Sequence, residues 1–250
     1  MVATSSKTLL LLAAGGILLF FVIPAGLLAS YEALTHQDLW FVYLERFMVK
    51  NPQDSAKARL PDDMRGVAQD AADHFGKMEY DEAAACYQVI LHKYPESLYA
   101  WSNLGVVRFQ QGKFDEARVA FLQSVALSPN DAFSWANLGI CYYQLQRYHD
   151  AIDALQKAIA FDPNDAKSYN YLGCCYSQTG EQAKAEAALK KALELNSKFG
   201  DAYFNLSLIY ATASPPDLDQ AKIDYQHALD LGIAKDPRLE KLISPSDDTK

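Results

Sequence analysis

The segment "WANLGICYY", Trp135–Tyr143, repeats the pattern of "WSNLGVVRF", Trp101–Phe109, at a distance of 34 residues. In a frame that places "LG" at positions seven and eight, similar units begin every 34 residues, at Met64, Leu98, Ala132, Ala166 and Gly200. Position eight is small in every unit: Ala71, Gly105, Gly139, Gly173 and Ser207. A fixed period of this length indicates an array of similar structural units.

The apolar and small residues of each unit follow helical spacing. They occupy positions four, seven, eight and eleven, and again positions twenty, twenty-four and twenty-seven. Steps of three and four residues place each set on one face of a helix. Turn signals such as Gln111-Gly112 and Thr179-Gly180 separate the two sets, and Pro or Asn-Asp closes the units. Each unit therefore predicts two antiparallel helices, and neighbouring pairs are expected to cover one another's apolar faces.

The order W-x-x-L-G-x-x-Y, then A-x-x-x-F, then Pro, at a 34-residue period, resembles the tetratricopeptide repeat (TPR) family. The resemblance covers residues 64–233, two thirds of the chain. It implies an all-α, right-handed α-α superhelical solenoid of helix-turn-helix repeats, with five repeats at 64–97, 98–131, 132–165, 166–199 and 200–233. Residues 234–250 are expected to form a capping helix and a tail.

Three departures from the family pattern are local. The first repeat has Asp70 and His74 at normally apolar places, as expected of an end unit that faces solvent. The second repeat has Arg108 where Tyr is usual. The fifth repeat regains its frame only after two extra residues around Ser214–Asp217, where two prolines should break the helix.

Residues 9–29 form a separate apolar segment, preceded by a short tail over 1–8. They are 21 residues without a charged or strongly polar group, and as a helix they would rise about 31 Å, the thickness of a bilayer core. The sequence therefore predicts a single transmembrane helix. The alternative is a signal peptide cleaved after Ala29, although the segment is long for one and the cleavage motif matches poorly. Lys7 precedes the segment and acidic residues follow it, which favours an extracytoplasmic repeat domain. The unpaired cysteines favour the cytoplasmic side instead.

Residues 30–63 link this segment to the repeats. An aromatic helix is expected at about 37–50, where residues 39–49 read "LWFVYLERFMV". At about 16 Å, that stretch is too short to span a bilayer. It either packs on the first repeat or lies at the membrane interface, where Trp and Tyr are favoured. The predicted lipid contacts are therefore residues 9–29, with 39–49 as a second candidate.

The sequence shows no catalytic, cofactor-binding or metal-binding motif. The net charge of −8 disfavours nucleic acid as a partner, because no basic run offsets the repulsion from phosphates. The five histidines are scattered, and the sequence contains neither H-E-x-x-H nor a phosphate-binding glycine loop. Small apolar side chains suit the positions of Cys141 and Cys175, so we expect buried free thiols there. We accordingly expect no enzyme activity and no cofactor.

What remains is a surface for binding protein. The TPR resemblance implies that the first helix of each unit lines a groove for a partner polypeptide. Carried over position by position, the candidate groove residues are Tyr99, Asn103, Phe109, Phe133, Asn137, Tyr143, Lys167, Asn170, Tyr171, Phe204 and Asn205. Carboxamides suit a peptide backbone because they both donate and accept hydrogen bonds, and aromatic rings offer a large contact area. The alternative is that these residues only pack the helices against one another.

The main hypothesis is a membrane-anchored scaffold, assembly factor or accessory subunit of a membrane or envelope complex. Its groove would bind a protein or peptide, with a membrane-embedded subunit among the candidates. One alternative is a secreted or periplasmic TPR module released by signal cleavage. Another is a non-catalytic support subunit of a membrane enzyme. The repeat pattern does not choose among these roles, because a fold does not determine a function.

Overall fold

The computed structural model describes residues 8–14, 17–23 and 60–244, and its chain divides into two compact units, Met1–Pro52 and Gln53–Lys250. The aromatic helix predicted at about 37–50 lies outside the described residues, as do the polar connector up to residue 59 and the last six residues of the tail. Each unit is therefore considered by itself.

The first unit differs from the transmembrane helix predicted over 9–29. It contains two antiparallel strands, β1 (Thr8–Ala14) and β2 (Ile17–Ile23), paired in register from Thr8 opposite Ile23 to Ala14 opposite Ile17. An apolar run has no periodicity that separates helix from strand. The Ile, Val and Phe content of the second half favours a strand, and the sequence between the strands is Gly-Gly, which is typical of a two-residue hairpin connection. In the described parts of the chain, we find no helix with both the length and the apolar character to cross a bilayer.

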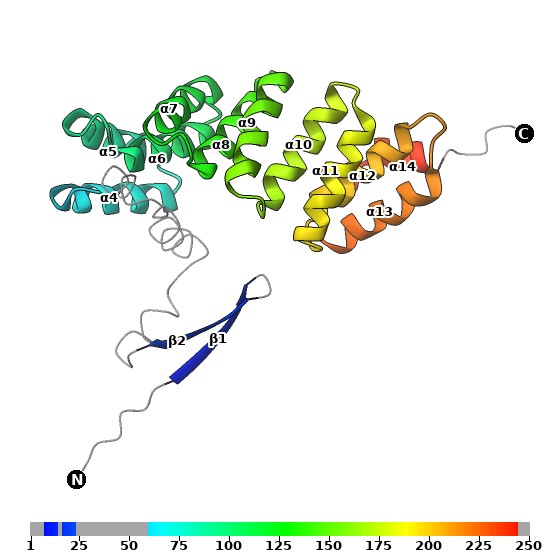
Figure 1. Ribbon diagram of the computed structural model, residues 1–250, viewed down its shortest axis with the longest axis horizontal. Helices are drawn as coiled ribbons and strands as arrows, with labels where there is room; N and C mark the ends of the chain where they lie inside the picture. Colours follow the sequence, from blue (N-terminus) through cyan, green and yellow to red (C-terminus); the bar gives the residue numbers. More distant parts are fainter. Residues whose placement is uncertain (1–7, 15–16, 24–59, 245–250) are drawn as a thin grey trace, which may run out of the picture. The chain divides into compact units, whose positions relative to one another are not determined.

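The second unit is an all-helical stack of helix pairs (Figure 1). A short 3-10 turn, η1 (Asp62–Met64), precedes the first pair. The pairs are α4 (Arg65–Gly76) with α5 (Tyr80–Lys93), α6 (Leu98–Gln110) with α7 (Phe114–Leu127), α8 (Ala132–Gln144) with α9 (Tyr148–Phe161), α10 (Ala166–Gln178) with α11 (Gln182–Leu195), and α12 (Gly200–Thr212) with α13 (Leu218–Asp230). Within residues 60–244 there is no strand, so the predicted solenoid of helix-turn-helix repeats is confirmed.

The repeated residues at the ends of the helices have local structural roles. Asp131 and Asp165 cap α8 and α10, because their carboxylates accept hydrogen bonds from the backbone N–H groups of Ser134 and Ser168, at 3.1 and 3.2 Å. The indole of Trp135 donates to the carbonyl of Pro129 in the preceding unit, at 2.8 Å. The Trp of one repeat and the Pro of the previous one are thus linked by a hydrogen bond between units.

Close packing explains the small residue at position eight. A Cβ atom added at Gly139 would lie 2.6 Å from Cγ of Leu155, and one at Gly173 would lie 2.6 Å from Cγ of Leu189. Glycine therefore lets the first helix of these units pack closely on the second without displacing the leucine. Each pair also contacts the next along the stack, and one buried cluster runs from α9 to α12 through Leu172, Leu189 and Leu206.

A final helix, α14 (Pro237–Ile243), packs against α12 and α13 at the end of the stack. Its residues Leu239 and Ile243 are buried with Tyr225 of α13. This is the segment predicted to close the last repeat. The extra residues after α12 lie in the connection to α13, as the two prolines there predict.

Candidate protein-binding surface

The first helices of successive repeats touch one another directly, α6 against α8, α8 against α10, and α10 against α12. The predicted groove residues all lie on these four helices. The face of the four helices that carries these residues is called the first-helix surface. Because the helices are in contact, this surface is continuous across four repeats. It is therefore long enough to meet several residues of an extended partner.

The predicted groove residues differ in how far they reach solvent. Tyr99, Asn103 and Asn170 are buried, and Lys167 is exposed. The half-buried residues, which present part of their side chain, are Phe109, Phe133, Asn137, Tyr143, Tyr171, Phe204 and Asn205. The structure thus divides the predicted set into buried residues and residues that keep part of their side chain at the surface.

The asparagines of the predicted groove are hydrogen-bonded to the protein itself. Asn103 and Asn137 each donate through Nδ2 to a backbone carbonyl four residues earlier, that of Tyr99 at 2.8 Å and that of Phe133 at 2.9 Å. Asn205 donates to Oδ1 of Asn170 in the preceding repeat, at 3.0 Å. These bonds fix the orientation of the carboxamides. In Asn137 and Asn205, which are half-buried, the second N–H of the amide group donates to no other residue in the described part of the chain.

The aromatic residues form edge-to-face contacts within and between repeats. Phe109 contacts Phe114 and Tyr143 contacts Tyr148 within their own repeats, with ring centroids 5.2 and 5.8 Å apart. Tyr143 and Tyr171 meet across neighbouring repeats on the first-helix surface, with ring centroids 5.5 Å apart. Tyr99 and Phe133 instead contact rings of the preceding second helix, Tyr87 at 6.2 Å and Phe121 at 6.4 Å. Tyr99 and Phe133 therefore join repeats from within, which is the packing role that the sequence left open.

Burial further disfavours ionisation of the phenols and the thiol at the centre of this surface. It raises the pKa of Tyr143 to about 12, and the nearby Cys174 adds to that shift. Burial and then the carboxylate of Asp201 raise the pKa of Cys174 to about 12 as well. The pKa of Tyr171 is raised by burial, by Cys174 and by Asp201. At neutral pH these groups are neutral, so the surface offers hydroxyl donors and apolar area rather than a cationic clamp.

All four cysteines are free, with Cys141 and Cys175 buried and Cys86 and Cys174 half-buried. Burial raises the pKa of Cys141 and of Cys175 to about 12, so both are inert thiols, as expected from their packing positions. Among the residues that the structure describes, no group of three His, Cys, Asp or Glu side chains is placed to hold a metal ion.

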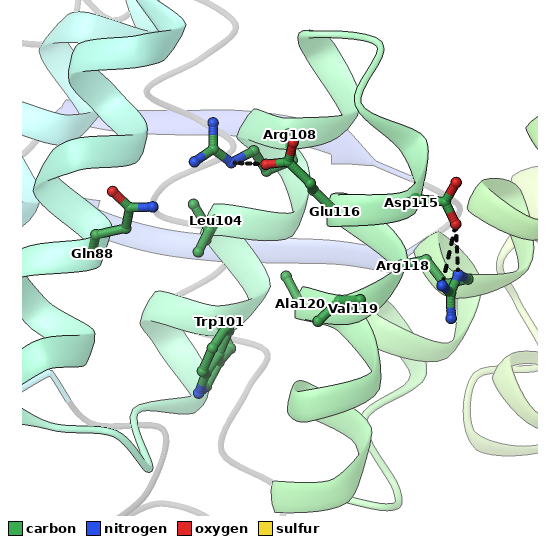
Figure 2. Close-up of a pocket in the computed structure, with 9 residues that line it drawn as sticks. All are labelled: Gln88, Trp101, Leu104, Arg108, Asp115, Glu116, Arg118, Val119 and Ala120. Atoms are coloured by element: carbon green, nitrogen blue, oxygen red, sulfur yellow. Dashed lines mark hydrogen bonds and ion pairs between the residues drawn. The ribbon is translucent and has the colours of Figure 1, made fainter.

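A hollow of about 450 Å³ lies between α5, α6 and α7 (Figure 2), away from the predicted groove residues. Its lining is Gln88, Trp101, Leu104, Arg108, Asp115, Glu116, Arg118, Val119 and Ala120. No site is expected here from the sequence. The sequence nevertheless contained one indication of it, because Arg108 stands at a repeat position where the family pattern has Tyr.

Comparison with known proteins supports the repeat fold built from these helix pairs. The model of a TPR family described as the cilia and flagella-associated protein 70 C-terminal domain matches residues 29–202. The chain belongs to this TPR family. No curated protein shows significant similarity to the chain.

Solved TPR structures share the fold. A crystal structure of MamA is 27% identical, covers 64% of this chain and 93% of its own, and has a TM-score of 0.59. TTC0263, a thermophilic TPR protein of Thermus thermophilus, is 24% identical over 72% of this chain and 97% of its own, with a TM-score of 0.56. YrrB, described as a TPR protein with an unusual peptide-binding site, is 20% identical over 78% of this chain and 95% of its own, with a TM-score of 0.58. The last two similarities show the fold alone.

Proposed function

We propose that the protein is a non-catalytic scaffold or assembly factor that binds a partner polypeptide on its first-helix surface. The observation that carries this proposal is the row of half-buried aromatic rings, Phe109, Tyr143, Tyr171 and Phe204, which extends over four helices in direct contact. Partly exposed aromatic side chains gain affinity with little loss of rotamer entropy. The TPR family and the peptide-binding site named for YrrB support the same class of function.

The chemistry of the surface favours an extended segment with apolar side chains. The phenols and the thiol at its centre are neutral, and Lys167 is the exposed cation among the predicted residues. Asn137 and Asn205 are positioned to bond the backbone of such a segment, while Leu208 on α12 adds an exposed apolar side chain. A partner recognised through a free C-terminal carboxylate fits this surface poorly, because the cations needed to clamp a carboxylate are few.

Site-specific crosslinking in intact cells tests the proposal. A photo-reactive phenylalanine analogue replaces Tyr143 or Leu208 on the first-helix surface, and replaces Phe161, an exposed residue of α9, as the matched control. We expect one discrete adduct from the first two positions and none from the third. The adduct should weaken when Asn137→Ala and Tyr171→Ala are added. Equal labelling from all three positions, or no adduct from any, would count against the proposal.

Attachment to a membrane is the second part of the proposal, and it rests on the sequence of residues 9–29 rather than on the strands found there. A segment of 21 residues without charge is costly to expose to water and is stabilised in hydrocarbon. We expect the chain to resist alkaline carbonate extraction from membranes, and a variant with Leu19→Arg and Phe20→Arg to be released. Recovery of the unmodified chain in the wash would contradict attachment.

The position of the repeats and the two alternative roles have their own tests. Protease added to intact cells or spheroplasts should degrade an extracytoplasmic repeat domain and spare a cytoplasmic one. A mature chain that starts near Ser30 would establish the released module instead of the anchored one. Enzyme activity that appears only when a membrane partner is co-purified would favour the support-subunit role.

A further inference from the structure

The hollow between α5, α6 and α7 occupies a place that later repeats fill with a tyrosine. The eleventh residue of the first helix is Arg108 in α6, and it is Tyr142 in α8, Tyr176 in α10 and Tyr210 in α12. The hollow is lined by Arg108 itself and by Val119, a residue that is 47% exposed. The empty space in the second repeat therefore corresponds to a filled one in the repeats that follow.

The contacts of Tyr176 show how the space is filled. Its hydroxyl accepts a hydrogen bond from Nε2 of Gln156 in α9, at 2.9 Å, and the ammonium of Lys184 in α11 lies 5.3 Å from its ring centroid. By position in the repeat, Gln156 corresponds to Gln88 and Lys184 corresponds to Glu116. Both corresponding residues line the hollow. The ring of Tyr176 thus lies between Gln156 and Lys184, and the residues at the same repeat positions form two walls of the hollow.

Arg108 does not replace the missing ring. Its Nε lies 3.1 Å from Oε2 of Glu116, and its Nη1 donates to Oε1 of Gln111 at 2.9 Å. These bonds draw the guanidinium toward the end of α6, and Figure 2 shows Gln88 on the opposite wall without a bond to any residue drawn. Within residues 60–244, the carboxamide of Gln88 has no hydrogen-bond partner and is exposed to solvent.

We propose that this hollow binds a tyrosine side chain presented by a partner polypeptide. The phenol hydroxyl accepts from Nε2 of Gln88, as Tyr176 accepts from Gln156, and the ring packs on Leu104 and Val119. The rim is electrically balanced, because Arg108 pairs with Glu116 and Arg118 pairs with Asp115 at 3.2 Å. A neutral ring therefore suits the hollow better than a charged ligand, and the Arg108 guanidinium adds a cation beside it. This surface is distinct from the first-helix surface.

The test uses N-acetyl-tyrosinamide, titrated into the full chain labelled with 5-fluorotryptophan and followed by fluorine NMR. Trp101 lines the hollow, whereas Trp135 belongs to the next repeat, where Tyr142 occupies the corresponding place. The Trp101 resonance, assigned with Trp101→Phe, should shift while that of Trp135 stays. N-acetyl-phenylalaninamide should bind about threefold more weakly or worse, because it lacks the acceptor for Gln88. N-acetyl-leucinamide should leave both resonances in place.

Variants separate the proposed contacts. Gln88→Leu should remove the preference for tyrosine over phenylalanine and keep ring binding. Arg108→Tyr fills the hollow with the protein's own ring and should abolish the Trp101 shift, whereas the matched control Lys198→Tyr, on an exposed turn, should not. Tyr143→Ala on the first-helix surface should also leave the shift unchanged. If Arg108→Tyr does not fold, Val119→Arg provides the second test of the hollow. The new side chain would cover the hollow from an exposed position, so binding of N-acetyl-tyrosinamide should weaken about tenfold or more.

An unmoved Trp101 resonance at saturating N-acetyl-tyrosinamide overturns the proposal. So does a full response in Arg108→Tyr or in Val119→Arg, and so does equal binding of the leucine and tyrosine amides. Loss of the shift in Tyr143→Ala would assign the tyrosine site to the first-helix surface instead.

Discussion

The rings of Tyr143 and Tyr171 meet edge to face across two successive repeats, with their centroids 5.5 Å apart and their planes at 73°. Such a pair is worth about 0.5–1.5 kcal/mol beyond the area that it buries. A double-mutant cycle with Tyr143→Ala and Tyr171→Ala should therefore give a coupling free energy in this range. Urea unfolding of the four proteins, fitted with a nearest-neighbour repeat model, measures it.

Tyr143 also contacts Tyr148 within its own repeat, at 5.8 Å, and the cycle separates the two contacts. A second cycle between Tyr143 and the distant Tyr87 provides the control, and it should give a coupling close to zero. If the Tyr143–Tyr171 coupling were no larger than that of the control, the two repeats would not be joined by these rings.

The repeat architecture was predictable because it depends on local spacing that recurs. Helical periodicity and turn residues place each helix, and five copies in one frame reinforce the prediction. The apolar segment 9–29 occurs once and lacks periodicity, so sequence alone did not distinguish a helix from the strands β1 and β2. The sequence also did not reveal how deeply each predicted groove residue is buried. Position in the repeat places Tyr99 and Tyr143 on equivalent faces, yet Tyr99 is buried against Tyr87 and Tyr143 is half-exposed.

The hollow between α5, α6 and α7 was not predictable from the sequence. Arg108 was recognised as a departure from the repeat pattern, but a departure does not reveal where the new side chain turns. Its bonds to Glu116 and Gln111, which leave the space beside Gln88 open, depend on residues from a different helix and a turn.

Even alanine, the smallest substitution, should lower the stability of the protein at position 139. Alanine in the middle of a helix is normally more stable than glycine by about 0.5–1 kcal/mol. At Gly139, however, the new Cβ would lie 2.6 Å from Cγ of Leu155, which is fully buried on α9. We expect Gly139→Ala to lower the free energy of unfolding by about 1–3 kcal/mol, as overpacked cores do, measured by urea denaturation.

Gly66 provides the matched control for that substitution. It lies in the first turn of α4, and a Cβ there would have no neighbour within 4 Å. Gly66→Ala should therefore raise stability or leave it unchanged. An increase in stability for Gly139→Ala of the same size as for Gly66→Ala would show that the contact with Leu155 relaxes freely.

The turn between α8 and α9 offers a stabilising change. Gln146 has a φ of 58°, in the left-handed region, at the repeat position where Gly112 has 72° and Gly180 has 82°. A residue with a Cβ is destabilised there by about 1–2 kcal/mol, and glycine is not. Gln146→Gly should therefore raise the free energy of unfolding by about 1 kcal/mol, observed as a higher midpoint of thermal unfolding.

The nearby Gln144 serves as the control for Gln146. It is exposed and lies at the last position of α8, so Gln144→Gly should lower stability through the added flexibility of glycine. The reciprocal change, Gly112→Ala, should be destabilising as well. Equal effects of glycine at 144 and 146 would show that backbone conformation does not determine stability at this turn.

Asp224 on α13 is a buried carboxyl where the second, third and fourth repeats have alanine: Ala120, Ala154 and Ala188. Its Oδ1 accepts from Gln220 at 3.2 Å, and its Oδ2 has no hydrogen-bond partner among the described residues. Burial raises the pKa of Asp224 above its ordinary value of 3.8, more than Gln220, His227 and Lys190 lower it. The ionised form is therefore unfavourable in the fold.

Asp224→Ala should accordingly raise the free energy of unfolding at pH 7 by about 1–2 kcal/mol, because it removes an incompletely bonded buried group. Since the folded pKa of Asp224 exceeds the unfolded one, its contribution is most favourable below pH 3.8 and is lost as pH rises through the folded value. The advantage of the variant should thus be largest at neutral pH and should shrink toward pH 3. Asp153→Ala, at an exposed carboxylate of α9, should change stability by less than about 0.5 kcal/mol. A less stable Asp224→Ala at pH 7 would mean that Lys190 and His227 compensate the buried charge in full.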